Sequence, residues 1–156
     1  MAAPHNAPTY EQDFVAWLED QAGRARRGEI DALDLENIAE ELEGMARSDR
    51  REIRNRLTVL LTHLLKCWAQ PNKRSASWLG TIAEQRQHLV ELIEDSPSLR
   101  SHPAEILERC YPWARRKAAQ QMRLRGGAFP ESCQFTIDEI LDVEWLPAQS
   151  DGTGKQ

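Results

Sequence analysis

Apolar side chains recur every three or four residues along most of the chain, which is the spacing that places them on one face of an α-helix. No segment keeps the alternation of period two that is typical of a half-buried strand. Leucine and alanine are common and valine is scarce, which also favours helices. The pattern predicts an all-α fold, a bundle of about five helices, over residues 10–26, 35–69, 76–94, 103–124 and 137–142.

Capping residues indicate where these helices begin and end. Thr9 and Gln12 have the spacing of a capping box, and so do Thr136 and Glu139. Asp34 can cap the helix that follows it, because its carboxylate accepts hydrogen bonds from free backbone N–H groups. The other predicted boundaries are Ser75 or Ser77 and Ser101 as starts, and Gly28, Ser96-Pro97 and Gly126-Gly127 as ends.

Two of the predicted helices contain residues that disturb helical geometry. Gly44 and the polar residues 47–50 favour a kink or break within 35–69, with Ser48 capping the second part, although one long helix is also compatible with the stripe. Pro112 lies inside 103–124 and should kink or divide that helix.

A short link containing Pro71 joins the second and third predicted helices, so they should form an antiparallel hairpin at the core of the bundle. Folding the chain about residue 73 would place His63 near Ala83 and Gln87. The apolar stripes predict the following buried residues: Phe14, Trp17, Leu42, Leu57, Leu61, Leu64, Trp68, Trp78, Ile82 and Leu89.

The length of 156 residues fits one domain, which we expect over 9–147 between a flexible arm, 1–8, and a flexible tail, 148–156. The longest apolar stretch, 57–65, is far shorter than the roughly 20 residues of a membrane span, so we expect no membrane association. The first residues lack the basic and apolar regions of a secretory signal. Three widely spaced cysteines predict neither disulfides nor a zinc site, and a cytoplasmic location fits them best.

Charged residues occur in blocks of one sign. Residues 29–43 hold seven acids and no base, and 47–56 hold five bases and two acids. Residues 109–125 hold six bases and no acid, and 131–144 hold five acids and no base. Such blocks can steer docking within the chain or the pairing of two copies. A pI near 5.4 argues against a general nucleic-acid binder but leaves room for a local basic patch.

Several segments together resemble one protein family. They are residues 10–18, 33–42, 56–66 and 96–99, the pairs Ser77-Trp78, Thr81-Ile82 and Gln85-Arg86, and the stretch from Phe129-Pro130 to Leu146-Pro147. From Tyr10 to Pro147 the chain is similar to the bacterial domain of unknown function 29 family. The resemblance implies an α-helical fold and a bacterial cytoplasmic protein, and it implies no activity, because none is assigned to the family. Pro112 departs from the uninterrupted helix expected there.

Polar residues inside these segments are the candidates for chemistry. Across the predicted hairpin, His63, Lys66, Glu84, Arg86 and Gln87 are within reach of one another and would form a polar cluster. In the alternative interpretation His63 bonds a neighbouring side chain and Lys66 is solvated. The further candidates are Asp13, Glu40, Glu41, Arg74 and Gln85.

The spacing of potential ligands does not predict a metal centre. Glu41 and His63 would be roughly 33 Å apart on a straight helix, so they cannot share an ion. No Glu-x-x-His or His-Glu-x-x-His spacing is present. We therefore expect no metal and no cofactor.

Arg56 and His63 are the candidate catalytic pair. Seven residues apart, they lie on the same helical face at a distance of roughly 10 Å. This spacing resembles the motif of the HEPN (higher eukaryotes and prokaryotes nucleotide-binding) ribonucleases, in which two protomers form a composite site. The resemblance implies that Arg56 contacts phosphate and that His63 acts in acid–base chemistry without a metal. Leu57 stands where those enzymes usually have a polar residue.

The chain lacks a glycine-rich phosphate loop, a Gly-x-Ser-x-Gly elbow and a recognisable Cys–His nucleophile arrangement. The leading hypothesis is therefore a non-catalytic module that binds a protein partner or associates with itself. The alternative is the HEPN-like ribonuclease with Arg56 and His63, which would need a local basic surface to hold RNA.

Overall fold

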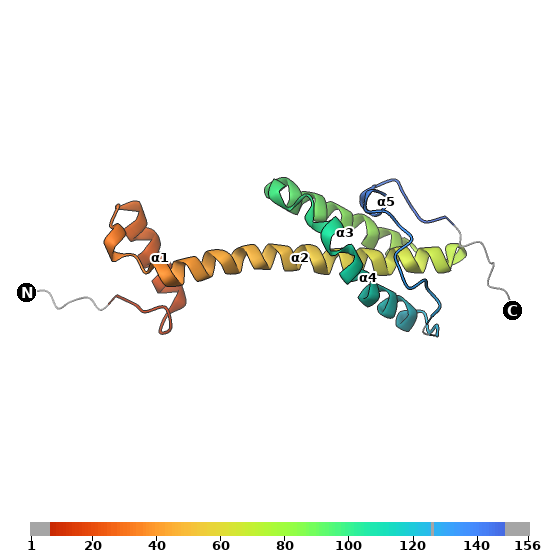
Figure 1. The fold of residues 1–156 in the computed structure, drawn as a ribbon, viewed down its shortest axis with the longest axis horizontal. Helices are drawn as coiled ribbons and strands as arrows, with labels where there is room; N and C mark the ends of the chain where they lie inside the picture. Colours follow the sequence, from red (N-terminus) through yellow and green to blue (C-terminus); the bar gives the residue numbers. More distant parts are fainter. Residues whose placement is uncertain (1–6, 126, 149–156) are drawn as a thin grey trace, which may run out of the picture. The chain divides into compact units, whose positions relative to one another are not determined.

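The computed structural model describes residues 7–125 and 127–148, and within them it contains helices and no strand. The predicted all-α fold is confirmed (Figure 1). The α-helices are α1 Phe14–Arg26, α2 Leu35–Ala69, α3 Ala76–Asp95, α4 His102–Gln121 and α5 Ile137–Leu141. Three single-turn 3-10 helices join them: η1 Ile30–Ala32, η2 Pro71–Lys73 and η3 Pro97–Leu99.

The chain packs as two compact units, Met1–Arg47 and Ser48–Gln156, and the boundary between them falls within α2. The single domain expected over 9–147 stays a prediction, and the expected flexible ends fall largely on 1–6 and 149–156, outside the described residues. Within the described ranges, no helix is long and apolar enough to span a membrane.

The break predicted within 35–69 is wrong, because α2 is one continuous helix of 35 residues. Gly44 in a helix interior costs only about 1 kcal/mol relative to alanine. Arg47 pairs with Glu40 at 3.1 Å and with Glu43 at 3.7 Å, so the residues expected to interrupt the helix support it instead. Ser48 is an interior residue of α2 and caps nothing.

The structure changes one predicted helix start. Asp13, and not Thr9, caps α1, and its carboxylate accepts a hydrogen bond from Ala16 N at 3.0 Å. The carbonyl of Thr9 instead closes a turn with the amides of Gln12 and Asp13. Gly28 follows the end of α1 with φ 74°, the left-handed conformation expected of a helix stop.

Three other predicted starts are confirmed. Asp34 Oδ1 accepts from Asn37 N at the start of α2, and Ser75 caps α3 through Trp78 N. Thr136 and Glu139 form a complete capping box on α5. Ser101 precedes α4 without capping it, because its hydroxyl donates to Glu105 at 2.6 Å.

Pro112 does not divide α4, which runs through it as one helix. The helix ends at Gln121, earlier than the predicted Gly126-Gly127, and Gly126 lies outside the described residues. Arg123 follows with φ 55°, so a left-handed arginine turns the chain where a glycine was expected.

The C-terminal unit contains the predicted antiparallel hairpin of α2 and α3 (Figure 1). Arg56 binds Gln85 across it, and Lys66 lies 4.5 Å from the ring centre of Trp78, so later residues of α2 meet earlier residues of α3. α4 runs in the same direction as α2, because Arg54 contacts Cys110 and Lys66 contacts Gln121.

Eighteen buried apolar residues form one core in this unit. They are Ile53, Leu57, Leu60, Leu61, Leu64, Leu65, Cys67, Ile82, Leu89, Leu99, Ile106, Cys110, Tyr111, Ala114, Ala118, Phe129, Phe135 and Ile140. Of the residues predicted to be buried, Trp68 and Trp78 are only partly buried against this core. Phe14 and Leu42 are exposed, so those two predictions are wrong.

Candidate functional site

Arg56 and His63 both lie on α2, but each binds a different group of the chain. Arg56 donates to Glu52 at 2.7 Å and to Gln85 at 3.4 Å. His63 Nδ1 lies 2.9 Å from the carbonyl oxygen of Val59, which suits a neutral ring that donates there. Burial lowers the pKa of His63, which also favours the neutral ring. These contacts give Arg56 and His63 no common partner, so they do not favour the ribonuclease hypothesis.

The five residues expected to form a polar cluster are not brought together, because each takes its own partner. The partners are Val59 for His63, Gln121 for Lys66, His88 for Glu84, Glu91 for Gln87, and C-terminal carbonyl groups for Arg86. Glu84 and Gln87 each contact a residue one turn further along α3. Such pairs within one helix compete with contacts across the hairpin.

Lys66 is buried between helices, where it contacts other side chains of the chain. Its side chain is only 8% exposed, and Nζ donates to Gln121 Oε1 at 3.1 Å while facing the ring of Trp78. Burial lowers the pKa of Lys66. The ammonium group thus joins α2, α3 and α4, and the expectation that Lys66 is solvated is wrong.

Among the described residues, Arg86 is the most deeply buried charged side chain, with 2% exposed. Its guanidinium donates to the carbonyl oxygens of Ile140 and Trp145, each at 2.8 Å, and to that of Glu139 at 3.5 Å. Carbonyl groups at a helix C-terminus have no partner within the helix, so Arg86 satisfies the Ile140 carbonyl that α5 leaves free, whereas the Glu139 carbonyl also accepts from Asp142 N at 3.2 Å. Arg86 therefore fastens the C-terminal segment to α3.

The remaining candidates also have partners within their own unit. Arg74 donates to the carbonyl oxygens of Cys67 and Pro147. It is therefore a second arginine, besides Arg86, that binds the C-terminal segment. The other four take these contacts: Asp13 caps α1, Glu40 pairs with Arg47, Glu41 accepts from Tyr10, and Gln85 accepts from Arg56.

In the N-terminal unit, α1 meets the start of α2 at Trp17, which is 2% exposed. Trp17 Nε1 donates to Asp34 Oδ2 at 3.2 Å, and the side chain of Gln21 accepts from Asp34 N at 2.8 Å. The hydrogen bond from Asn37 lowers the pKa of Asp34, so the carboxylate stays ionised as an acceptor. The ring of Tyr10 packs edge-on against Trp17.

An open cleft of about 440 Å³ adjoins this network, lined by residues that include Tyr10, Trp17, Arg24 and Asp34. Four of its lining residues already pair with one another, because Arg24 pairs with Asp20 at 2.7 Å and Trp17 Nε1 donates to Asp34. The cleft therefore adjoins the contacts that join α1 to α2.

The N-terminal unit is distinguished by the large apolar side chains that it exposes to solvent. Within its described residues Trp17 is the one buried apolar side chain. The large apolar side chains that this unit exposes are Phe14, Val15, Leu18, Ile30, Leu35, Leu42 and Met45. An exposed apolar face of this kind indicates an interaction surface.

On α2 the bare side chains continue the stripe that is buried further along the same helix. Eighteen residues are five full turns of an α-helix, so Leu35 shares a face with Ile53, and Leu42 shares one with Leu60. Leu35 and Leu42 are 61% and 62% exposed, whereas Ile53 and Leu60 are fully buried. The stripe predicted from the sequence is real, but its first part has no partner.

We name the exposed residues Leu35, Ala39, Leu42 and Ala46 the α2 stripe. Sequence reasoning treated it as core, because a stripe looks the same whether its partner belongs to the chain or not. A usable signal was present in the charges. Residues 29–43 carry acidic side chains on every turn. Because charged side chains favour water, few sides of the helix there can pack against other elements of the same chain.

In the part of the chain that the structure describes, no group of three or more His, Cys, Asp or Glu residues is arranged to hold a metal ion. Comparison with protein families matches residues 9–146 to the model described as "Domain of unknown function DUF29". The searches of curated proteins and of solved structures found no match.

Proposed function

The chain belongs to the DUF29 family, whose description names no activity, and on that premise we propose that it is a non-catalytic helical module that associates with a second copy of itself. The observation that carries this proposal is the α2 stripe, bare over 35–46 and buried from Ile53 onward. A bacterial cytoplasmic setting, implied by the family resemblance, belongs to the same proposal.

The energetic reason for a partner is the imbalance within the N-terminal unit. Burying one leucine side chain stabilises a protein by roughly 1.5–3 kcal/mol. Among its described residues, the unit leaves Leu35, Leu42 and Met45 in water and buries Trp17 alone of its apolar side chains. A second helix laid on the stripe would recover that free energy without refolding the chain.

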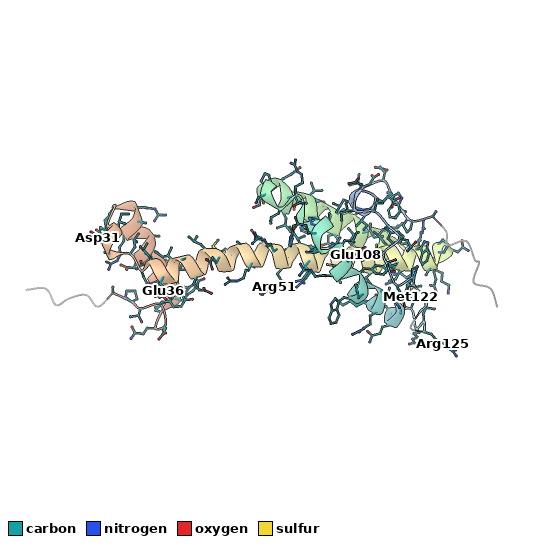
Figure 2. All side chains as sticks on the ribbon, viewed as in Figure 1. Asp31, Glu36, Arg51, Glu108, Met122 and Arg125 are labelled. Carbon is teal, nitrogen blue, oxygen red and sulfur yellow. The ribbon has the colours of Figure 1, made fainter. Side chains whose placement is uncertain are left out.

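The charges beside the stripe favour a second copy of α2 in antiparallel orientation. Reversing the helix about Met45 places an acidic residue opposite a basic residue at three positions and opposite another acidic residue at one, Glu41 with Asp49. The pairs of opposite charge are Glu36 with Arg54, Glu40 with Arg50, and Glu43 with Arg47. Acidic Glu36 and basic Arg51, labelled on α2 in Figure 2, mark the two halves of this pattern. Opposite charges set orientation and speed encounter, whereas a parallel pair would place like charges together.

The composition of the stripe also suits close helix packing. Leu35, Ala39, Leu42 and Ala46 are spaced 4, 3 and 4 residues apart, the spacing of a coiled-coil seam. The alanines present little side chain, so two backbones can approach closely. Reversal about Met45 brings Leu42 of one copy level with Ser48 of the other, between Ala46 and Asp49. Asp49 follows at the next seam position and ends the apolar run.

Light scattering coupled to size exclusion tests this proposal across protein and salt concentrations. Wild type should be a dimer at tens of micromolar, and Leu42→Glu should make it a monomer with unchanged helical content. Val90→Glu is the matched control, because Val90 is an exposed apolar residue on α3, 41% exposed, outside the stripe. A wild-type protein that stays monomeric at every concentration would contradict self-association.

A charge exchange tests the antiparallel orientation. Glu36 and Arg54 make no ion pair within the described part of the chain, so each can be reversed without breaking an existing one. Glu36→Arg and Arg54→Glu should each weaken the dimer several-fold, since exposed pairs contribute roughly 0.2–1 kcal/mol and occur twice in a symmetric dimer. The double exchange should restore wild-type affinity. Two single effects that merely add would reject this pairing.

A further inference from the structure

A second surface, independent of the α2 stripe, lies on the outer side of α4. At about 100° per residue, Arg109, Trp113, Arg116 and Lys117 fall within about 100° of one another on this helix. All four are exposed. The residues that pack α4 into the core, which are Ile106, Cys110, Ala114 and Ala118, are centred about 100° around the helix from these four. The orientation of α4 is therefore fixed, and we name the four exposed residues the α4 face.

The positive charge of the α4 face is not neutralised by the described residues. None of its three bases has an ion pair there. The acidic residues next to the face on the same helix are Glu105, one turn before Arg109 and bound by the Ser101 hydroxyl, and Glu108. Arg123 and Arg125 follow the end of α4, and Arg125 is labelled beside Met122 in Figure 2. The whole run from Arg109 to Arg125 thus presents positive charge without an acid.

Trp113 distinguishes this face from an ordinary solvated helix surface. Its side chain is 60% exposed, whereas the C-terminal unit places Trp68, Trp78 and Trp145 against the core. The guanidinium of Arg116 lies 5.3 Å from the indole ring centre. An indole with a guanidinium close to its ring offers a flat surface on which an aromatic ligand can stack, with positive charge nearby.

We propose that the α4 face binds single-stranded nucleic acid, with an unpaired base stacked on Trp113 and neighbouring phosphates held by Arg109, Arg116 and Lys117. Proteins that hold single strands combine basic residues, which follow the backbone, with aromatic rings that stack bases. Stacking needs an unpaired base, which a duplex keeps within its own stack. RNA and DNA share this chemistry.

Two features favour a nucleic acid over other anionic partners. A lipid surface would gain little, because interfacial helices insert a broad apolar face and the α4 face offers one aromatic side chain. An acidic peptide would use the bases but would leave the indole without a stacking partner. The net charge of −5 does not prevent binding, because charges farther away than about 8 Å are largely screened at physiological salt.

The test measures the fluorescence anisotropy of 5′-labelled 20-nucleotide oligo(U) RNA and oligo(dT) DNA mixed with the full chain from 50 to 300 mM salt. Wild type should bind both, with affinity that falls steeply as salt rises. Equal binding would mean recognition of base and phosphate, and a preference for RNA would mean that the 2′-hydroxyl contributes. An absence of binding to both oligomers at 50 mM salt would overturn the proposal.

Variants separate stacking from charge. Trp113→Ala should weaken binding by on the order of tenfold at each salt concentration and leave the salt dependence unchanged, and Trp113→Phe should restore most of the affinity. Arg116→Ala should reduce the slope of log affinity against log salt by about 0.7, the value for one phosphate contact on a single strand. Arg26→Ala, an exposed arginine near the end of α1, is the control and should leave both quantities unchanged.

Two further outcomes would also overturn the proposal. Trp113→Ala and Arg26→Ala with equally small effects would show non-specific attraction to the chain. Sedimentation with phosphatidylserine vesicles, combined with no binding of either oligomer, would assign the face to a lipid surface. Circular dichroism checks that each variant keeps the helical content of wild type, which we expect because these side chains lie outside the core.

Discussion

The two units of the chain contain the same kind of apolar helical stripe, which is buried in one unit and exposed in the other. In the C-terminal unit Ile53 and Leu60 of α2 are fully buried within a core shared by α2, α3, α4 and α5. In the N-terminal unit Leu35 and Leu42, five turns earlier on the same face, are more than 60% exposed. A stripe therefore reports that a helix has a partner, and it does not report which chain supplies that partner.

The units also differ in what holds them together. The C-terminal unit combines its apolar core with buried polar ties from Lys66 and Arg86 to neighbouring segments. The N-terminal unit relies on Trp17 and hydrogen bonds around Asp34. Hydrogen bonds contribute about 1 kcal/mol each, so the N-terminal unit has far less stabilisation of its own.

The largest expected effect is on the buried half of the stripe. Leu60→Ala should lower the free energy of unfolding by about 2–5 kcal/mol, because it removes buried methyl groups and leaves a cavity in the core. Urea denaturation followed by circular dichroism measures this change. A loss below about 0.5 kcal/mol would mean that Leu60 is not packed as described, and the contrast between the units would fail.

The next largest effect is expected for the buried hydrogen bonds that join the C-terminal segment to α3. Arg86→Leu should cost roughly 1–3 kcal/mol, because the buried carbonyl group of Ile140 and the partly buried one of Trp145 lose their donor. Limited proteolysis should then cut within 139–147 faster than in wild type. Arg100→Leu, which changes an exposed arginine, is the control and should leave the cleavage rate unchanged. Equal cleavage in wild type and in Arg86→Leu would show that Arg86 does not fasten this segment.

The sequence predicts features that depend on residues close together in the chain. Helical periodicity located the helices, and Asp34, Ser75 and the pair Thr136–Glu139 were identified as caps from their spacing alone. The antiparallel hairpin followed from the short link at Pro71. These features arise from local backbone and side-chain chemistry, which a single sequence carries.

Features that depend on distant contacts were missed. The partners of Arg86 lie more than 50 residues along the chain, so the sequence suggested a polar cluster where the structure has a tie to backbone carbonyls. Leu42 was assigned to the core because periodicity says nothing of what lies opposite. The exposure of Trp113 was equally hidden, since tryptophan usually belongs to the core.

A smaller effect, on pH dependence, separates the units through His63. Burial lowers the pKa of His63 in the folded C-terminal unit, so the unfolded chain binds the proton more readily. Stability should therefore be intact above the unfolded pKa of about 6.5 and should fall as pH decreases below it. Urea midpoints measured from pH 7.5 to 5.5 should show this decline in wild type and a shallower one in His63→Gln. Parallel curves for the two proteins would show that His63 titrates alike in both states.

The smallest expected effect is on the bare half of the stripe. Leu42 is already 62% exposed, and leucine and alanine have similar helix propensities, so Leu42→Ala should change the unfolding free energy of the dilute monomer by less than about 0.5 kcal/mol. The same change should weaken self-association, because Leu42 would be buried only in the dimer. The comparison with Leu60→Ala is matched in residue type, helix and face. A loss of about 2 kcal/mol or more at dilution would mean that Leu42 is packed within a single chain, and the α2 stripe would no longer be available to a second copy.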